Sequence, residues 1–146
     1  MLQLLRKIAF PFSLVYALVV HVRNFFYNTG VMKSKSYQTP TLCVGNLSVG
    51  GTGKTPMIEY LVRLLKGHKI AVLSRGYKRK SKGFLVADAN SAVLDLGDEP
   101  YQLHQKFPEI TVAVDADRRN GINQLENTVK PEVILLDDAF QHRRVK

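Results

Sequence analysis

The stretch SVGGTGKTP, residues 48–56, decides the fold because it carries most of a phosphate-binding loop. The usual pattern, G-x-x-x-x-G-K-[ST], has a glycine at each end of the loop, followed by a lysine and a hydroxyl residue. Gly53, Lys54 and Thr55 match its second half, and Ser48 stands in place of the first glycine. Serine is small, so we expect it to replace that glycine where its φ is negative.

The segments on both sides of the loop favour the same interpretation. TLCVGN, residues 41–46, reads as a short strand, and residues 55–67 have the apolar spacing of a helix. A glycine-rich turn can arise by chance, but strand, loop and helix in this order form the context that binds phosphate. We expect Lys54 to reach the β- and γ-phosphates of ATP and the Thr55 hydroxyl to bind Mg²⁺. The predicted nucleotide site consists of Ser48, Val49, Gly50, Gly51, Thr52, Gly53, Lys54 and Thr55.

Apolar strands alternate with helices along the rest of the chain. Further strands are expected at 69–76, 83–88, 109–115 and 131–138, and further helices at 98–107 and 118–127. The alternation predicts an α/β fold, a P-loop NTPase-like, mostly parallel sheet flanked by helices. Ligands of such sheets bind at the carboxyl ends of the strands.

The last expected strand ends in two carboxylates. In VILLDDAFQH, residues 133–142, Asp137 and Asp138 follow an apolar run, as in a Walker B element. Because neighbouring side chains point in different directions, one carboxylate can hold Mg²⁺ while the other holds a water or Lys54. A polar strand end that only caps the next segment is the alternative.

Other polar clusters also follow expected strands. SRGYKRKSK, residues 74–82, is either a solvated basic loop or a site for an anionic acceptor or membrane headgroups. Asp98 and Glu99 begin an expected helix, where carboxylates also serve as caps. Arg118 is either an ordinary surface arginine or a group that stabilises transferring phosphate. No His and Cys spacing typical of a metal site occurs.

The N-terminal third is purely cationic, since no Asp or Glu precedes Glu59. We expect residues 1–36 to form an apolar, basic helical segment and residues 37–146 to form the P-loop core. A narrow stripe of Arg6, Ser13, Ala17, His21 and Asn24 on an otherwise apolar helix favours attachment to an anionic membrane surface. A helix packed on its own domain and a secretory signal peptide are alternatives, although no convincing cleavage site follows.

The motifs taken together resemble the tetraacyldisaccharide 4'-kinase family of lipid A biosynthesis. They are GNLSVGGTGKTP, LSRGY, GDEP, VAVDADR and DDAFQH, in this order, behind an apolar basic N-terminus. The resemblance implies transfer of the γ-phosphate of ATP to the 4'-hydroxyl of an acylated glucosamine disaccharide 1-phosphate. It also implies a peripheral or monotopic protein at the cytoplasmic face of the bacterial inner membrane, with no nucleic acid partner.

The resemblance assigns roles to matching residues. Lys54 and Thr55 match the nucleotide and Mg²⁺ positions, and Asp137 and Asp138 match the Walker B carboxylates. Asp98 resembles the catalytic carboxylate that orients or deprotonates the sugar hydroxyl. The matching positions near the acceptor or the phosphates are Asn46, Arg75, Tyr77, Glu99, Arg118 and His142.

Two features depart from the family. Ala139 stands where the family commonly has glycine, which matters only if φ is positive there. The family's chains are longer, so its second domain is expected to be absent from this chain of 146 residues. A nucleotide-binding membrane module without catalysis is therefore one alternative function. A basic nucleic-acid-dependent NTPase is another, since the net charge is +9.

Overall fold

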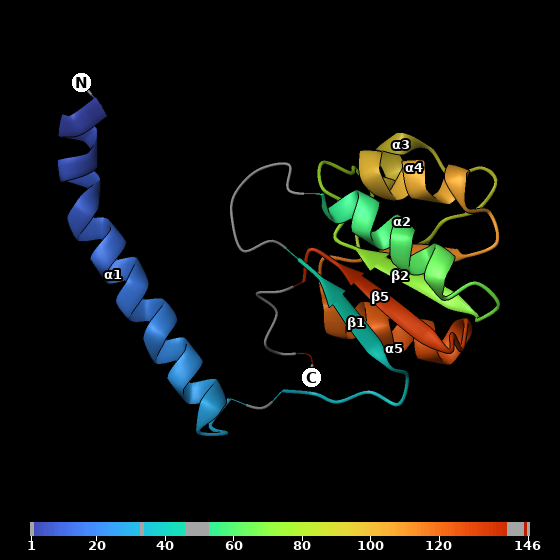
Figure 1. The fold of residues 1–146 in the computed structure, drawn as a ribbon, viewed down its shortest axis with the longest axis horizontal. Helices are drawn as coiled ribbons and strands as arrows, with labels where there is room; N and C mark the ends of the chain where they lie inside the picture. The colour runs from blue at the N-terminus through green and yellow to red at the C-terminus, as the bar shows by residue number, and fades with distance from the viewer. Residues whose placement is uncertain (1, 33, 46–52, 140–144, 146) are drawn as a thin grey trace. The chain divides into compact units, whose positions relative to one another are not determined.

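The chain folds into two compact units, Met1–Ser34 and Lys35–Lys146, in a computed structural model that describes residues 2–32, 34–45, 53–139 and 145. The first unit contains α1 (Leu2–Asn28), which continues through Pro11 (Figure 1). Large apolar side chains of α1, among them Phe12, Tyr16 and Phe25, are exposed. No helix within the described part of the chain has the length and apolarity needed to cross a bilayer.

The second unit is built on a sheet of five strands in the order β1-β5-β2-β4-β3 (Figure 1). The strands are β1 (Thr41–Val44), β2 (Ile70–Ser74), β3 (Leu85–Val86), β4 (Thr111–Val114) and β5 (Val133–Asp137). Four of them run parallel, and β3 pairs with β4 in the antiparallel direction. The α/β class with a mostly parallel sheet is thereby confirmed.

Helices cover both faces of the sheet, as the continuous apolar runs of buried parallel strands require. They are α2 (Lys54–Leu64), α3 (Val93–Leu96), α4 (Asp98–Lys106) and α5 (Arg118–Thr128). Val72 and Leu135 pack in one core cluster with residues of α2 and α4. Their strand neighbours Leu73 and Leu136 point to the opposite face, where α5 packs. Figure 1 shows α2 and α4 on one side of the sheet and α5 on the other.

The register of the strands aligns their carboxyl ends. Leu73 lies opposite Leu136, and Val44 lies opposite Asp137. The next residue of β2, Ser74, therefore lies beside Asp137 on the α2 face. The short helix α3 was not predicted, because its four residues are too few to show a helical period.

Gly97, between α3 and α4, provides a stability prediction. Its φ is +91°, and a Cβ there would lie 2.7 Å from the backbone oxygen of Tyr77. We expect Gly97→Ala to lower the free energy of unfolding by roughly 2–4 kcal/mol, from left-handed strain and a clash with backbone that cannot move aside. Urea unfolding followed by circular dichroism measures the loss.

Gly83→Ala is the matched control. Gly83 also has a positive φ, +71°, but no atom lies within 4 Å of the position that an alanine Cβ would take. It should lose only the strain, about 1 kcal/mol. Equal losses in the two variants would show that the contact with Tyr77 is not the cause.

Candidate active site

A cleft of about 520 Å³ lies at the carboxyl ends of β2 and β5. The first residues of α2 and α4 also line it, so two helix N-termini, with their positive dipole ends, meet two strand ends there. The lining residues are Lys54, Ser74, Arg75, Tyr77, Asp98, Glu99, Pro100, Asp137 and Asp138. This edge of a parallel sheet is where ligands of α/β folds bind.

Lys54 is held at the first position of α2 by an ion pair across the cleft. Its Nζ lies 2.9 Å from Oδ1 of Asp138. The hydrogen bond to Asp138 raises the pKa of Lys54, so its ammonium stays charged. Because an ammonium has three N–H donors, Lys54 can keep this contact while it binds a phosphate oxygen. The sequence predicted that one carboxylate of the Asp137–Asp138 pair holds either a water or Lys54, and the structure shows Asp138 in contact with Lys54.

Asp137 is buried at the end of β5, with 8% of its surface exposed. Its Oδ2 accepts a hydrogen bond of 3.2 Å from the hydroxyl of Ser74. Burial raises the pKa of Asp137, and the nearby charge of Glu99 adds to this effect. A buried carboxylate with one hydroxyl partner has free lone pairs, so a cation would lower its free energy.

The residues next to Asp137 fit a magnesium ion. A small hollow of about 10 Å³ lies beside the cleft, with Thr55, Ser74, Glu99 and Asp137 as its polar lining and Ile58, Val72, Pro100 and Leu103 as its apolar lining. Hydroxyl and carboxylate oxygens are the ligands that Mg²⁺ prefers, and it keeps several waters when phosphate supplies the remainder. A cluster of three or more His, Cys, Asp or Glu that could hold a metal does not occur among the described residues. A Thr55 and Asp137 site needs no such cluster.

Asp98 and Glu99 open α4 on the far side of the cleft. Both are exposed, while the following Pro100 is buried and anchors the helix. A carboxylate in the first turn of a helix is stabilised by the positive end of the helix dipole. An exposed carboxylate facing Lys54 across a cleft can accept a proton from a bound hydroxyl group.

The basic loop after β2 divides into two kinds of side chain. Arg75 and Tyr77 line the cleft, and Nζ of Lys78 lies 5.4 Å from the centre of the Tyr77 ring. Arg79 instead folds back on the loop, where it donates to the backbone oxygen of Gly83 at 2.6 Å and to Ser81 at 3.1 Å. Arg79 is thus bound within the loop, whereas Arg75, Lys78, Lys80 and Lys82 are exposed.

The cleft gathers most of the predicted site that the structure describes. Lys54, Arg75, Tyr77 and the acidic pairs 98–99 and 137–138 line it, and Thr55 lines the adjoining hollow. Seven predicted residues lie outside the described part of the chain: Asn46, Ser48, Val49, Gly50, Gly51, Thr52 and His142. Gly53 precedes α2 with a φ of +84°, which suits glycine.

Two expectations about single residues can be compared with the backbone. Arg118 does not line the cleft or the hollow, and its side chain is buried against backbone oxygens. Its predicted contact with the acceptor or phosphate therefore finds no support in this geometry.

Ala139 is not among the described residues with positive φ, whereas Asp138 is, at +52°. Alanine at 139 is thus compatible with the backbone.

Ser74 is a site residue that was not predicted. It lies at the carboxyl end of β2, and only the strand register shows that it adjoins Asp137. Serine after an apolar strand is common, so its hydroxyl carried no signal by itself. The order of the strands would have been needed to find it.

Ser74→Ala should destabilise the protein through Asp137. The variant leaves a buried carboxylate without its hydroxyl donor, at a cost of about 1–3 kcal/mol in the free energy of unfolding. Ser91→Ala is the matched control, because Ser91 donates to an exposed carboxylate, Asp88, at 3.0 Å. That loss should stay within about 0.5 kcal/mol. Urea unfolding at neutral pH compares the two, and a smaller loss in Ser74→Ala than in Ser91→Ala would contradict the assigned burial effect.

Comparison with known proteins gives one consistent result. A family model described as tetraacyldisaccharide-1-P 4'-kinase matches residues 5–146. A tetraacyldisaccharide 4'-kinase of Flavobacterium johnsoniae is 61% identical over 99% of this chain and 43% of its own length. One from Parabacteroides distasonis is 56% identical over 95% of this chain and 39% of its own length.

A solved structure agrees with these relatives. LpxK from Aquifex aeolicus, crystallised in complex with ATP, superposes with a TM-score of 0.90 at 42% sequence identity. The match covers 97% of this chain and 46% of that protein. The chain therefore spans less than half the length of the relatives that it matches, and it belongs to the tetraacyldisaccharide-1-P 4'-kinase family.

Proposed function

We propose that the protein transfers the γ-phosphate of Mg-ATP to the 4'-hydroxyl of an acylated glucosamine disaccharide 1-phosphate. One observation carries the proposal: Lys54, the Asp137–Asp138 pair and Asp98, which come from three separate parts of the chain, meet around a single cleft. The family and the ATP held by the Aquifex relative support the choice of donor. The acceptor follows from the names of the relatives.

The donor side of the cleft would consist of α2 and the end of β5. Lys54 would bind the β- and γ-phosphate oxygens, and its charge would offset the negative charge that spreads over the transferring group. Mg²⁺, when bound, neutralises phosphate charge and aligns the γ-phosphorus. Thr55 and Asp137 would hold this ion, because they supply a hydroxyl and a carboxylate at one hollow.

The acceptor side would consist of α4 and the loop after β2. The acceptor's hydroxyl oxygen forms the new bond to phosphorus as the bond to ADP breaks, and Asp98 would accept the hydroxyl proton. Glu99, Arg75 and Tyr77 line the cleft and would contact the sugar or its phosphate, and Glu99 also lines the hollow beside Asp137. Asn46 and His142, outside the described residues, remain predictions for this side, whereas the buried Arg118 lines neither the cleft nor the hollow.

Transfer of labelled phosphate tests the proposal. The chain and the longer Flavobacterium johnsoniae relative are incubated with Mg-ATP and the acylated disaccharide 1-phosphate in detergent micelles. Product from both supports the kinase. Mg-ATP binding by the chain, with product only from the relative, would make this chain a nucleotide-binding module that lacks catalysis by itself. Hydrolysis stimulated by RNA or DNA, without lipid product, would favour the nucleic-acid-dependent NTPase.

We also propose that α1 attaches the protein to an anionic membrane surface at the cytoplasmic face of the inner membrane. The first unit carries no acidic residue, and apolar side chains are exposed along α1. Basic residues near such a helix add roughly 1 kcal/mol each on an anionic surface.

Co-sedimentation with vesicles measures this attachment. Binding to vesicles of phosphatidylglycerol and phosphatidylethanolamine should exceed binding to neutral phosphatidylcholine vesicles by at least about tenfold and fall with salt. Phe12→Ser with Tyr16→Ser should abolish it, whereas Tyr60→Ser on α2, a similarly exposed aromatic of the second unit, should not. Equal binding by both variants would mean that α1 is not the anchor.

A further inference from the structure

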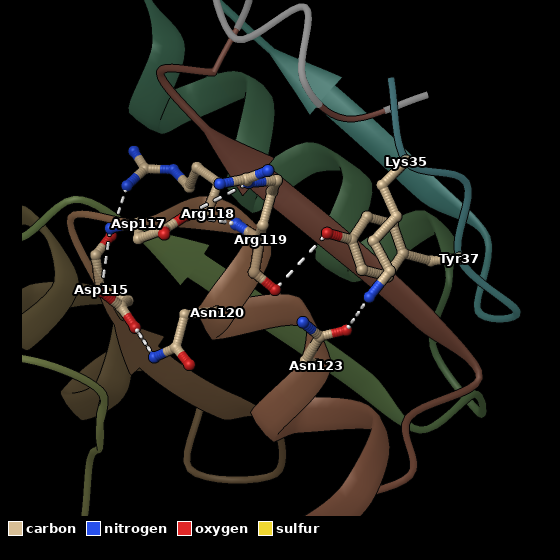
Figure 2. A network of polar contacts seen from close by, with 8 residues as sticks. All are labelled: Lys35, Tyr37, Asp115, Asp117, Arg118, Arg119, Asn120 and Asn123. Carbon is tan, nitrogen blue, oxygen red and sulfur yellow. Dashed lines mark hydrogen bonds and ion pairs between the residues drawn. The ribbon is translucent and has the colours of Figure 1, made fainter. Parts of the chain in front are cut away.

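Arg118 has an unusual environment for an arginine. Only 2% of its surface is exposed, and it is the largest of the fully buried side chains. Its guanidinium donates to two backbone oxygens, that of Asp115 after β4 and that of Asp137 at the end of β5. No ion pair to Arg118 occurs among the described residues, and burial lowers its pKa. Figure 2 shows the guanidinium beside the turn that contains Asp115 and Asp117.

This arrangement costs free energy. A guanidinium removed from water normally needs a carboxylate partner, and here Nε is buried with no hydrogen-bond partner among the residues that the structure describes. An apolar residue would fill the same space without that penalty. The two backbone contacts, together with the nearby negative charges of Asp137, Asp138 and Asp115, account for an arginine at this position.

The oxygen of Asp137 belongs to a peptide that is held at both of its polar atoms. Arg118 Nη2 donates to the oxygen of Asp137 at 3.0 Å, and the N–H of Asp138 in the same peptide donates to the oxygen of Val44 at 2.9 Å. With both atoms bonded, the plane of the peptide cannot rotate. The next residue, Asp138, is consequently kept at a φ of +52°, a left-handed conformation that side chains other than glycine adopt at a cost.

The orientation of this peptide sets the directions of two carboxylates. On one side, the Asp137 carboxylate meets the Ser74 hydroxyl on the α2 face. On the other side, the left-handed turn brings Asp138 to Lys54 at 2.9 Å. If φ of Asp138 relaxed to a right-handed value, its carboxylate would leave Lys54.

We propose that Arg118 is a positioning residue: its buried guanidinium fixes the peptide between Asp137 and Asp138, and thereby aims one carboxylate at the magnesium site and the other at Lys54. The inference rests on the proposed function for its magnesium site. In this role Arg118 does not contact the phosphate or the acceptor. It acts on them only through the peptide at the end of β5.

The test compares neighbouring arginines. Arg118→Met removes the N–H donors and keeps an unbranched side chain. Arg118→Lys keeps the positive charge, but its ammonium lacks the planar, forked donors with which a guanidinium reaches both oxygens. Arg119→Met is the matched control, because Arg119 is the next residue of α5 and its exposed side chain only approaches Asp117, at 3.9 Å. Thermal unfolding first establishes which variants are folded.

Amide hydrogen exchange measures, without any ligand, how firmly the peptide between Asp137 and Asp138 is held. The Asp138 N–H should exchange at least about tenfold faster in Arg118→Met than in Arg119→Met, while amides in the middle of β2 stay within about threefold. Unchanged exchange at Asp138 in a folded Arg118 variant would overturn the proposal. Unfolding of both Arg118 variants would also overturn it, because Arg118 would then hold the whole fold rather than one peptide.

Nucleotide binding then measures how the loss of Arg118 affects the proposed magnesium site. Affinity for a fluorescent ATP analogue is measured with Mg²⁺ and with EDTA. Arg118→Met should reduce the gain due to Mg²⁺ by at least about tenfold, with affinity in EDTA changed less than about twofold. Equal loss under both conditions would overturn the link to the magnesium site. If the unaltered chain binds no nucleotide but Asp138 exchange responds as expected, the proposed function fails while the role of Arg118 in holding the peptide stands.

Discussion

Lys54→Ala is expected to abolish phosphate transfer while leaving the fold intact. In the proposed function Lys54 would provide the charge that faces the transferring phosphoryl group, so its loss should lower the rate by a factor on the order of 10³ or more, about 4 kcal/mol of transition-state stabilisation. Stability should change by less than about 1 kcal/mol, because the ion pair to Asp138 joins side chains that are 22% and 61% exposed and is screened by solvent. Transfer of labelled phosphate and urea unfolding measure the two effects.

Two variants define the origin of that loss. Lys66→Ala removes an exposed lysine just beyond α2 and should leave transfer unchanged. Lys54→Arg keeps the charge but changes its shape and should retain partial activity. Near-normal transfer by Lys54→Ala would show that the loop is not the nucleotide site.

Asp98→Asn should give the second largest loss. The amide has the size of the carboxylate but cannot take up a proton, so the rate of transfer should fall by roughly 10²–10⁴. Affinity for Mg-ATP should stay within about twofold, because Asp98 lines the cleft but not the small hollow that contains Thr55 and Asp137. The measurement pairs the transfer rate with binding of a fluorescent ATP analogue.

Glu99→Gln is the direct comparison, since Glu99 is the other exposed carboxylate at the start of α4. A role in binding the acceptor predicts a loss of less than about tenfold, mainly as a higher KM. A greater loss in the rate constant for Glu99→Gln than for Asp98→Asn would transfer the role of proton acceptor to Glu99.

The sequence was sufficient for the features that depend on neighbours along the chain. The helix that begins at Lys54 was predicted from the spacing of its apolar residues, and the strand that ends at Asp137 from an apolar run followed by two carboxylates. The rule that ligands bind at the carboxyl ends of parallel strands also predicted that Lys54 and Asp137 lie at one edge of the sheet. The prediction that Asp98 belongs to the same site came from the family resemblance instead.

Features that depend on strand order could not be predicted in this way. Ser74 acquires its role only because β2 lies next to β5, and Arg118 is buried only because α5 starts where β4 and β5 end together. Charge patterns suggest that an arginine faces water, and nothing nearby in the sequence indicates its two backbone partners. The antiparallel direction of β3 likewise follows from the path of a loop rather than from its two residues.

The position of β5 has a consequence for how the protein is made. β5 is the last of the five strands to leave the ribosome, yet it lies between β1 and β2, and it ends at Asp137, directly before Asp138. β1 can therefore pair only after β5 has been synthesised. Because these two strands are far apart in the sequence, their pairing is a late and slow step of folding. The ion pair between Lys54 and Asp138 forms only then. In the proposed function, ATP binding during synthesis would thus report the insertion of β5, and a nascent chain released before Asp137 would have neither a complete β5 nor the carboxylates of Asp137 and Asp138.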